Sequence, residues 1–186
     1  MTDQTRRSIL KRMLLAAMVG LDAAPAVART INVPWYGQKN SSDCGRAVLA
    51  SLAARRGGSA EAAYRKLPEP TDPRGYSISD MRRHASRVGV GLSVAGPSGV
   101  VIAGSCGGGP AIAAHMARLS RVVAGGRPVV VPVSSGFGGG HYLVLVGAAG
   151  DGFTALDPAS PGLRSMSRDQ LASSMCGYGY LALIAS

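Results

Sequence analysis

The sequence predicts an α+β domain, in which helices from the first half of the chain pack on an antiparallel sheet from the second half. The first half is rich in alanine and carries apolar residues at helical spacing. The second half contains short runs of valine, leucine and tyrosine that are separated by glycine, aspartate and proline. Strands that follow helices as a group favour one antiparallel sheet. A length of 186 residues suits a single domain.

After the first 30 residues, the domain is expected to begin with an extended segment over residues 31–36 and to form its first helix at Cys44. Ser42 or Asp43 can cap this helix, because their side-chain oxygens accept hydrogen bonds from the free N–H groups of a first turn. Arg55-Arg56-Gly57-Gly58 supplies cations and glycine at the far end. Cys44 is therefore predicted to lie in the first turn of a helix with a buried apolar stripe.

Two more helices are expected in the first half. Residues 60–67 form a short helix, and the proline-rich loop 68–73 ends it because neither a helix nor a strand tolerates so many prolines. The next helix begins after a cap at Ser77 or Ser79 and ends at Gly89.

The rest of the chain is predicted to hold one more helix and the strands. The expected ranges are a short strand over 90–95, a glycine-rich loop over 96–110, a helix over 111–123, and strands over 128–133, 141–147, 153–156 and 178–184.

The first 28 residues are expected to be a cleavable export signal rather than part of the domain. Basic residues precede a short apolar run over 13–21, and Ala26-Val27-Ala28 offers the small residues that a signal peptidase accepts. Thr5-Arg6-Arg7-Ser8-Ile9-Leu10-Lys11 looks like a twin-arginine signal. The alternative is a basic amphipathic helix that stays attached. We therefore expect a signal over 1–28 and a single folded domain over 29–186.

This signal predicts a bacterial protein that acts in the periplasm or is secreted. Its partners during export would be the twin-arginine translocase and signal peptidase. No apolar run reaches the roughly 20 residues that a membrane-spanning helix needs, so a soluble domain is expected. We also expect the domain to be a monomer.

Charge and composition narrow the function classes. The formal net charge is +10, which can favour nucleic acid, anionic lipid or an acidic cell-wall polymer as a partner. The arginines are scattered, however, and two phenylalanines and one tryptophan offer few stacking platforms, so nucleic-acid binding is disfavoured. The sequence lacks the G-x-x-x-x-G-K-[ST] loop, and we expect neither ATP nor another cofactor.

Three cysteines leave one thiol unpaired whatever disulfide forms. A bridge between Cys106 and Cys176 with Cys44 free fits an exported protein, and the alternative is that no cysteine is bridged. Cys44 at a helix N-terminus has the position that lowers a thiol pKa and makes a nucleophile. The competing interpretation of Cys44 is a small buried apolar residue.

His141 is the best candidate for the base that activates this thiol. It follows three glycines and opens a predicted strand, and Asp157 ends the next strand. Two antiparallel strands joined by a short turn bring these residues together, and a carboxylate there would orient the imidazole. Asp157 can instead be an ordinary Asp-Pro turn. His84 and His115 are interpreted as surface or packing histidines.

Gln38 precedes Cys44 by six residues, and its amide can donate a hydrogen bond to the oxyanion of a tetrahedral intermediate, together with the Cys44 N–H. Taken alone, it is an ordinary polar loop residue.

Several blocks in this order resemble the bacteriocin-processing, double-glycine-leader peptidases, cysteine peptidase family thirty-nine. They are Gln38, Asp43-Cys44-Gly45-Arg46-Ala47, Ser77-Ile78-Ser79-Asp80-Met81-Arg82, Arg87-Val88-Gly89, Arg127-Pro128-Val129-Val130, His141-Tyr142-Leu143-Val144-Leu145 and Asp157-Pro158. The resemblance covers nearly the whole chain after the signal. It implies a papain-like fold, with Cys44 as nucleophile, His141 as base, Asp157 as the residue that orients it and Gln38 as oxyanion donor.

The chain also departs from that family. Leader-processing members are usually fused to an ABC transporter, whereas here an export signal precedes the domain, and the glycine-rich segment around Cys106 looks longer than usual. We therefore expect a free-standing peptidase acting on a peptide or protein. The alternatives are a non-catalytic relative that binds a peptide or an envelope partner, and a thiol amidase or acyltransferase with a non-protein substrate.

Overall fold

The computed structural model describes residues 30–97, 106, 109–135 and 140–186. The predicted signal over 1–28 and most of the predicted loop over 96–110 lie outside these ranges. Within them, none of the helices has the length and apolar character needed to cross a bilayer.

A six-stranded antiparallel sheet forms the centre of the fold, with the strand order β1-β6-β2-β3-β4-β5. The strands are β1 (Leu92–Ala95), β2 (Val129–Ser134), β3 (Gly140–Ala149), β4 (Gly152–Asp157), β5 (Ser160–Ser167) and β6 (Ala182–Ala185). The predicted antiparallel sheet is thus confirmed.

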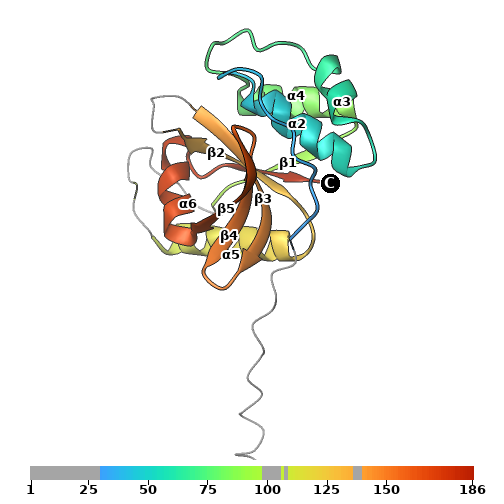
Figure 1. Cartoon of the computed structure of the whole chain (residues 1–186). Helices are drawn as coiled ribbons and strands as arrows, with labels where there is room; N and C mark the ends of the chain where they lie inside the picture. The colour runs from blue at the N-terminus through green and yellow to red at the C-terminus, as the bar shows by residue number, and fades with distance from the viewer. Residues whose placement is uncertain (1–29, 98–105, 107–108, 136–139) are drawn as a thin grey trace, which may run out of the picture.

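The helices lie on both sides of the sheet (Figure 1). The helical elements are α2 (Cys44–Arg55), α3 (Ala60–Lys66), α4 (Ile78–Ala85), the 3-10 helix η1 (Ser86–Val88), α5 (Pro110–Ala124), α6 (Arg168–Met175) and the 3-10 helix η2 (Cys176–Tyr178). Helices α2 to α4 gather at one end of the molecule, and α5 and α6 cover the other face of the sheet.

Each face of the sheet belongs to its own apolar core, because successive strand residues point to opposite faces. On β2, Val130 packs in the core that contains α2, whereas Val129 and Val131 pack in the core that contains α5. On β3, Val144 and Leu145 divide in the same way. The central strands β2, β3 and β6 are therefore buried on both faces, which explains their continuous runs of apolar residues.

Two elements were missing from the sequence prediction. Strand β5 is a mostly exposed edge strand made of small and polar residues, so it carries no apolar alternation. Helix α6 is short, and only Leu171 and Met175 of it are buried. The predicted strand over 178–184 is correct only at its end, because Tyr178 closes η2 and Gly179 adopts a left-handed conformation.

The capping predictions have mixed outcomes. Ser77 caps α4 by accepting from the Asp80 N–H, and Asp80 returns the bond in a capping box. Asp43 occupies the N-cap position of α2, but its side chain makes no capping hydrogen bond, so that prediction was wrong. The carboxylate of Asp43 turns instead toward Arg46 and Tyr64.

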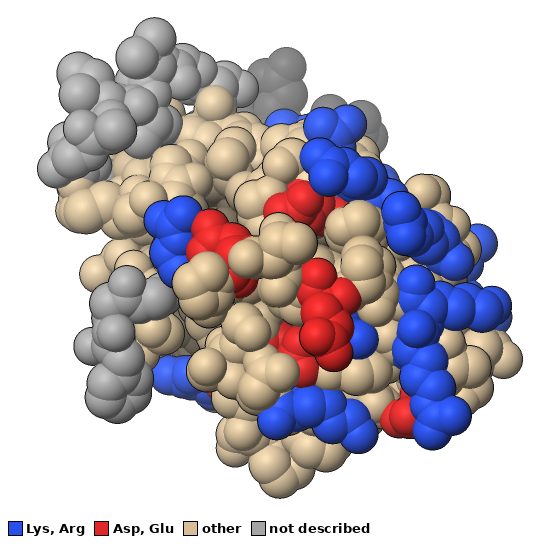
Figure 2. Space-filling model, turned by 90° about the horizontal axis from the view of Figure 1, so that it is seen from above, with Lys and Arg blue, Asp and Glu red and all other residues tan. Residues whose placement is uncertain are grey.

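Charges on the face that carries α2 to α4 are mixed. Figure 2 shows this face, with basic side chains along one edge and acidic side chains nearer its centre. Several arginines there pair with nearby carboxylates, among them Arg65 with Glu61 at 2.8 Å and Arg83 with Asp80 at 3.4 Å. Exposed pairs of this kind contribute little to stability.

Candidate active site

Strands β3 and β4 bring His141 and Asp157 together. His141 is the second residue of β3, Asp157 is the last residue of β4, and the two strands pair antiparallel, with Val144 opposite Leu156. The start of β3 therefore lies against the end of β4. The predicted neighbourhood of the two residues is present in the structure.

The imidazole of His141 contacts the Asp157 carboxylate directly. Nε2 of His141 lies 2.7 Å from Oδ1 of Asp157, and the two side chains are 14% and 12% exposed. The Ala159 N–H donates to the same Oδ1 at 2.9 Å, and Arg164 Nη1 donates to Oδ2 at 3.4 Å. The carboxylate is thus fixed on both oxygens and points at the ring.

The N-terminal segment holds the same turn from the other side. The indole Nε1 of Trp35 donates to the backbone oxygen of Asp157 at 2.9 Å. The N–H of Gln38 donates to the backbone oxygen of Pro158, also at 2.9 Å. These bonds attach the loop that leads into α2 to the end of β4, so they join Cys44 to the His141–Asp157 pair through the backbone.

Cys44 is the first residue of α2, and its thiol is free and buried, at 1% exposure. Interaction with this thiol is one of the causes that raise the pKa of His141, so the sulfur lies near the ring. Because Nε2 of the ring is bound to Asp157, the nitrogen available to Cys44 is Nδ1. The structure therefore brings Cys44, His141 and Asp157 into one row.

The contacts in this row change the acidity of His141 and Asp157. Burial alone lowers the pKa of His141, but hydrogen bonds to Asp157 and Cys44 and attraction to both outweigh it and raise that pKa to about 9. For Asp157, burial acts to raise the pKa, and the bonds from His141 and from the Ala159 N–H reverse this and leave it lowered. At neutral pH the pair is an imidazolium and a carboxylate.

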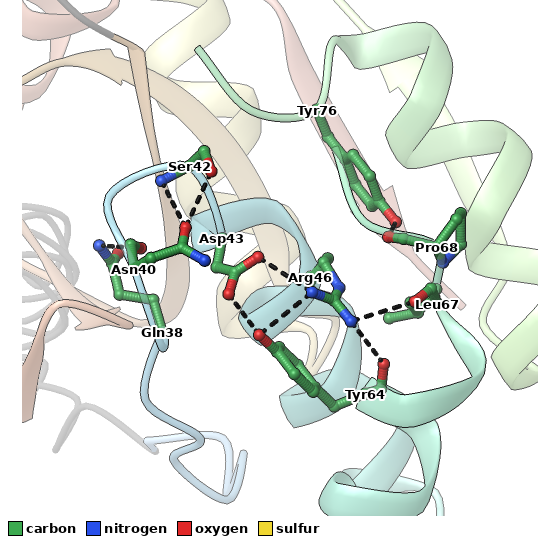
Figure 3. Close-up of polar contacts among 9 residues, drawn as sticks. All are labelled: Gln38, Asn40, Ser42, Asp43, Arg46, Tyr64, Leu67, Pro68 and Tyr76. Carbon is green, nitrogen blue, oxygen red and sulfur yellow. Dashed lines mark hydrogen bonds and ion pairs between the residues drawn. The ribbon is translucent and has the colours of Figure 1, made fainter. Parts of the chain in front are cut away.

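Gln38 lies in the loop before α2, but its amide is not free. Its Nε2 donates to the backbone oxygen of Asn40 at 3.0 Å, as Figure 3 shows, while its Oε1 is buried without a hydrogen-bond partner. Gln38 is thus six residues before Cys44, but its amide N–H group donates within its own loop and does not point a free donor at the site.

A cavity of about 410 Å³ opens beside His141. Its walls come from the loop before α4 and the first residue of that helix, from the start of β3 and from η2, and they include Tyr76, Ile78, Gly140, Tyr142 and Tyr178. Tyr142 donates its hydroxyl hydrogen to the backbone oxygen of Tyr76 at 3.0 Å, which ties the two walls together. A cleft of this size between two layers is typical of a site for part of a ligand.

The other two histidines lie away from this row. His84 is 7% exposed and packs against the Tyr76 ring, with the ring centroids 5.0 Å apart and the ring planes tilted by 41°. His115 is 3% exposed on α5. Burial lowers the pKa of both, so each is a neutral packing residue, as the sequence indicated. In the described ranges, no cluster of three or more His, Cys, Asp or Glu side chains could hold a metal ion.

Sequence reasoning missed several residues that shape the site. Trp35, Arg164 and Tyr178 reach it from separate parts of the chain, and nothing in their local patterns indicates this. Arg46 could have been predicted, because a cation three residues after Asp43 on a buried helix can reach its carboxylate.

The Cys106–Cys176 disulfide is present and Cys44 is free, which confirms that predicted pairing.

The comparisons with known proteins rest on the fold. The sequence matches no family model, and no curated protein shows significant similarity to it. The peptidase domain of Streptococcus ComA, a bifunctional ABC transporter in a quorum-sensing pathway, aligns over 83% of this chain and 98% of its own, with 21% identity and a TM-score of 0.61.

Two further solved structures are similar. A double glycine motif protease from an AMS/PCAT transporter, solved with its leader peptide, aligns over 87% of this chain and 96% of its own, with 17% identity and a TM-score of 0.57. A protein described as a C39-like peptidase from Bacillus anthracis aligns over 84% and 96%, with 14% identity and a TM-score of 0.58. The chain therefore has the papain-like α+β fold of C39 peptidase domains.

Proposed function

We propose that this chain, which has the fold of C39 peptidase domains, is a cysteine peptidase that hydrolyses peptide bonds with Cys44 as nucleophile. One observation carries the proposal: His141 Nε2 lies 2.7 Å from Asp157 Oδ1, while its other ring nitrogen is left to the Cys44 thiol. A thiol at a helix N-terminus, a base and a buried carboxylate that orients the base are the parts that thiol acyl transfer requires.

The chemistry follows from the protonation of the row. His141 holds the proton that the thiol gives up, because its pKa of about 9 keeps the ring charged at neutral pH. The Cys44 sulfur then bonds to the substrate carbonyl carbon, and the C=O π electrons move to the oxygen. When the oxyanion collapses, the C–N bond breaks and the leaving amine takes the proton from His141.

The second half of the reaction uses the same groups in reverse. The neutral His141 takes a proton from water, and the hydroxide oxygen bonds to the thioester carbon. Collapse of this second oxyanion breaks the C–S bond, releases the acid product and returns the thiolate beside the imidazolium. Asp157 keeps the ring in one orientation through both halves.

The oxyanion would be held by the Cys44 N–H and by the amide of Gln38. For that role, Gln38 Nε2 must exchange the Asn40 carbonyl for the oxyanion. The buried, unpartnered Oε1 supports such a turn, because the present amide orientation leaves one polar atom unsatisfied. A new hydrogen bond to the substrate oxyanion can thus offset the loss of the bond to Asn40.

A peptide substrate is favoured by the cleft and by the neighbours. The cavity beside His141 can accept a side chain next to the scissile bond. One neighbour with the same fold was solved with a leader peptide bound. We place the substrate of this chain in this cavity beside His141, where Ile78 and Tyr178 contribute to the walls.

We also propose that residues 1–28 direct export through the twin-arginine translocase. The Cys106–Cys176 disulfide supports an oxidising compartment, where such bonds persist. The test is processing in a bacterial host with that translocase. Replacing Arg6 and Arg7 by lysine should stop appearance of the mature protein outside the cytoplasm, and unchanged processing after Ala28 would show a signal of another kind.

The peptidase proposal is tested by turnover of a mixed peptide library, read by mass spectrometry. We expect cleavage by the purified protein, loss of all cleavage in Cys44→Ala, and loss of about 10²-fold or more in His141→Ala, as is usual for a general base. The control His84→Gln changes a histidine outside the row and should keep most of the activity. Cleavage by Cys44→Ala at the wild-type rate would exclude Cys44 as the nucleophile.

A further inference from the structure

We propose that Arg46 is a positioning residue for the nucleophile: it draws the Asp43 carboxylate away from the start of α2 and neutralises it, which leaves the first turn free to stabilise a negative charge on Cys44 or on the substrate oxygen. The proposal rests on the peptidase function proposed above. It concerns three residues, Asp43, Arg46 and Tyr64, which we call the buried network.

Asp43 is the centre of this network. It is 1% exposed, and although it occupies the N-cap position of α2, its side chain accepts no bond from that helix's N–H groups. Its Oδ1 instead accepts from Arg46 Nη1 at 3.2 Å, and its Oδ2 accepts from the Tyr64 hydroxyl. Figure 3 shows this carboxylate facing Arg46 and Tyr64.

Arg46 is held by more than the ion pair. Its side chain is 8% exposed, and its guanidinium carbon lies 4.1 Å from the centre of the Tyr64 ring. Its Nη2 donates to the backbone oxygens of Tyr64, at 3.4 Å, and Leu67, at 3.2 Å, at the C-terminal end of α3. Cations are favoured at that end of a helix. The guanidinium is therefore fixed between two helices.

Tyr64 keeps the carboxylate in place from the second helix. Burial and the hydrogen bond to Asp43 raise the pKa of Tyr64, so its hydroxyl remains a donor over the whole physiological range. Arg46 Nη1 also approaches this hydroxyl, at 3.3 Å. The arrangement carries a cost, because Arg46 Nε is buried without an acceptor. A network kept in spite of that cost suggests a use other than stability.

The use follows from the position of Asp43. An aspartate at an N-cap normally accepts from the second or third N–H of its helix, which here belong to Gly45 and Arg46. In that position the carboxylate would lie at the first turn of α2, on the residue next to Cys44. Its charge would oppose a negative charge on the sulfur. It would also take up the free N–H groups of the first turn, whose partial positive charge should stabilise the thiolate. Pairing with Arg46 removes both obstacles.

The test measures how fast iodoacetamide alkylates Cys44 as a function of pH, with Cys44→Ser to confirm the labelled residue. Cys44 is 1% exposed, so absolute rates include opening of the site, but the midpoint of the pH profile does not. Arg46→Met should move the midpoint upward by about one unit, which is about a tenfold loss of rate below the midpoint. kcat/KM at neutral pH should fall with it.

The decisive variant is the double substitution Asp43→Asn with Arg46→Met, which removes both charges and can pack in the same space. It should return the midpoint to within a few tenths of a unit of the wild-type value, which a loss of packing would not do. A double variant displaced as far as Arg46→Met alone would overturn the proposal, as would an Arg46→Met profile that matches the wild type.

Folding is checked by circular dichroism for each variant, because an unpaired buried carboxylate is strongly destabilising. If Arg46→Met does not fold, Arg46→Lys takes its place: a smaller upward shift is expected, since lysine keeps the charge but not the fork, and no shift would contradict the proposal. A wild-type Cys44 that iodoacetamide never labels would overturn the peptidase function itself, whereas labelling with equal midpoints in all variants would overturn the positioning role alone.

Discussion

At the scale of single residues, the site depends on the two nitrogens of one imidazole. Asp157 occupies Nε2 and leaves Nδ1 for the Cys44 sulfur, so the carboxylate decides both the orientation of the ring and where its proton lies. Asp157 is itself held by the Ala159 N–H, by Arg164 and by the Trp35 indole. The histidine therefore acts as part of a supported row rather than as a lone base.

The raised pKa of His141 predicts the alkaline limit of activity. The reactive pair needs a protonated His141, so kcat/KM should fall as pH rises through about 9. Asp157→Asn keeps a side-chain oxygen that can accept from the ring but removes the negative charge that helps to raise this pKa, so the fall should move to lower pH, with a smaller loss of activity at the optimum than in His141→Ala. A pH–rate profile of each variant checks this, and an unmoved alkaline limit in Asp157→Asn would contradict it.

The same shift fixes the sign of a stability effect. The folded-state pKa of His141 lies above its ordinary value of 6.5, so the contact with Asp157 stabilises the folded chain fully below about pH 6.5 and is lost as pH rises through about 9. The Asp157 pKa is lowered, so this contribution also disappears in acid as the carboxylate is protonated.

At the scale of elements, the site is a meeting of the first turn of α2, the start of β3 and the end of β4. The loop before α4 supports this meeting where Gly75 approaches the loop before α2. Gly75 has a φ of +90°, and a Cβ added there would lie 2.6 Å from the backbone oxygen of Ser42. Ser42 is two residues from Cys44, so the contact bears directly on the nucleophile.

Gly75→Ala should therefore lower both stability and activity. The left-handed conformation costs roughly 1 kcal/mol for a residue with a Cβ, and the contact with Ser42 must add to this. Gly126→Ala is the matched control, because Gly126 has a φ of +83° and open space around its Cβ position. Thermal unfolding and kcat/KM of the two variants test the idea; equal effects on activity would mean that the Ser42 contact does not matter.

The Cys106–Cys176 disulfide fixes another element of the cleft. Cys176 begins η2, which carries Tyr178, and the Tyr178 hydroxyl would lie 2.6 Å from a Cβ added at Gly140, next to His141. The bridge spans a sequence separation of 70 residues, which corresponds to about 4 kcal/mol in the chain-entropy account. Replacing both cysteines by serine should lower the free energy of unfolding by about 2–4 kcal/mol in urea titrations. An unchanged free energy would show that the bridge does not constrain the unfolded chain.

The elements also show where sequence reasoning succeeds and where it stops. The β3 and β4 runs are buried and apolar, so their pattern located His141 and Asp157 at a shared edge of the sheet. Strand β5 is exposed and polar, so no pattern announced it or the arginine that it brings to Asp157. The Asp43 cap prediction was wrong because the capping rule considers the helix N–H groups alone, whereas Arg46, one turn along α2, and the Tyr64 hydroxyl of α3 bind the same carboxylate.

At the scale of the whole molecule, the six-stranded sheet separates two cores with different tasks. The core between the sheet and α2 holds Cys44 and reaches the β3 and β4 residues next to the candidate site, whereas the core under α5 fills the other face. The role of Gln38 as oxyanion donor remains a prediction, because its amide can bind the oxyanion only after its hydrogen bond to the Asn40 backbone oxygen is broken.

The measurement that tests the central claim most directly is intact-protein mass spectrometry after exposure to a peptide that carries a thiol-directed electrophile at its C-terminal carbonyl. We expect one adduct, mapped to Cys44, that forms at neutral pH in the wild type and in His84→Gln and is lost or strongly slowed in His141→Ala. No adduct on Cys44, or an adduct that forms as fast in His141→Ala as in the wild type, would contradict it.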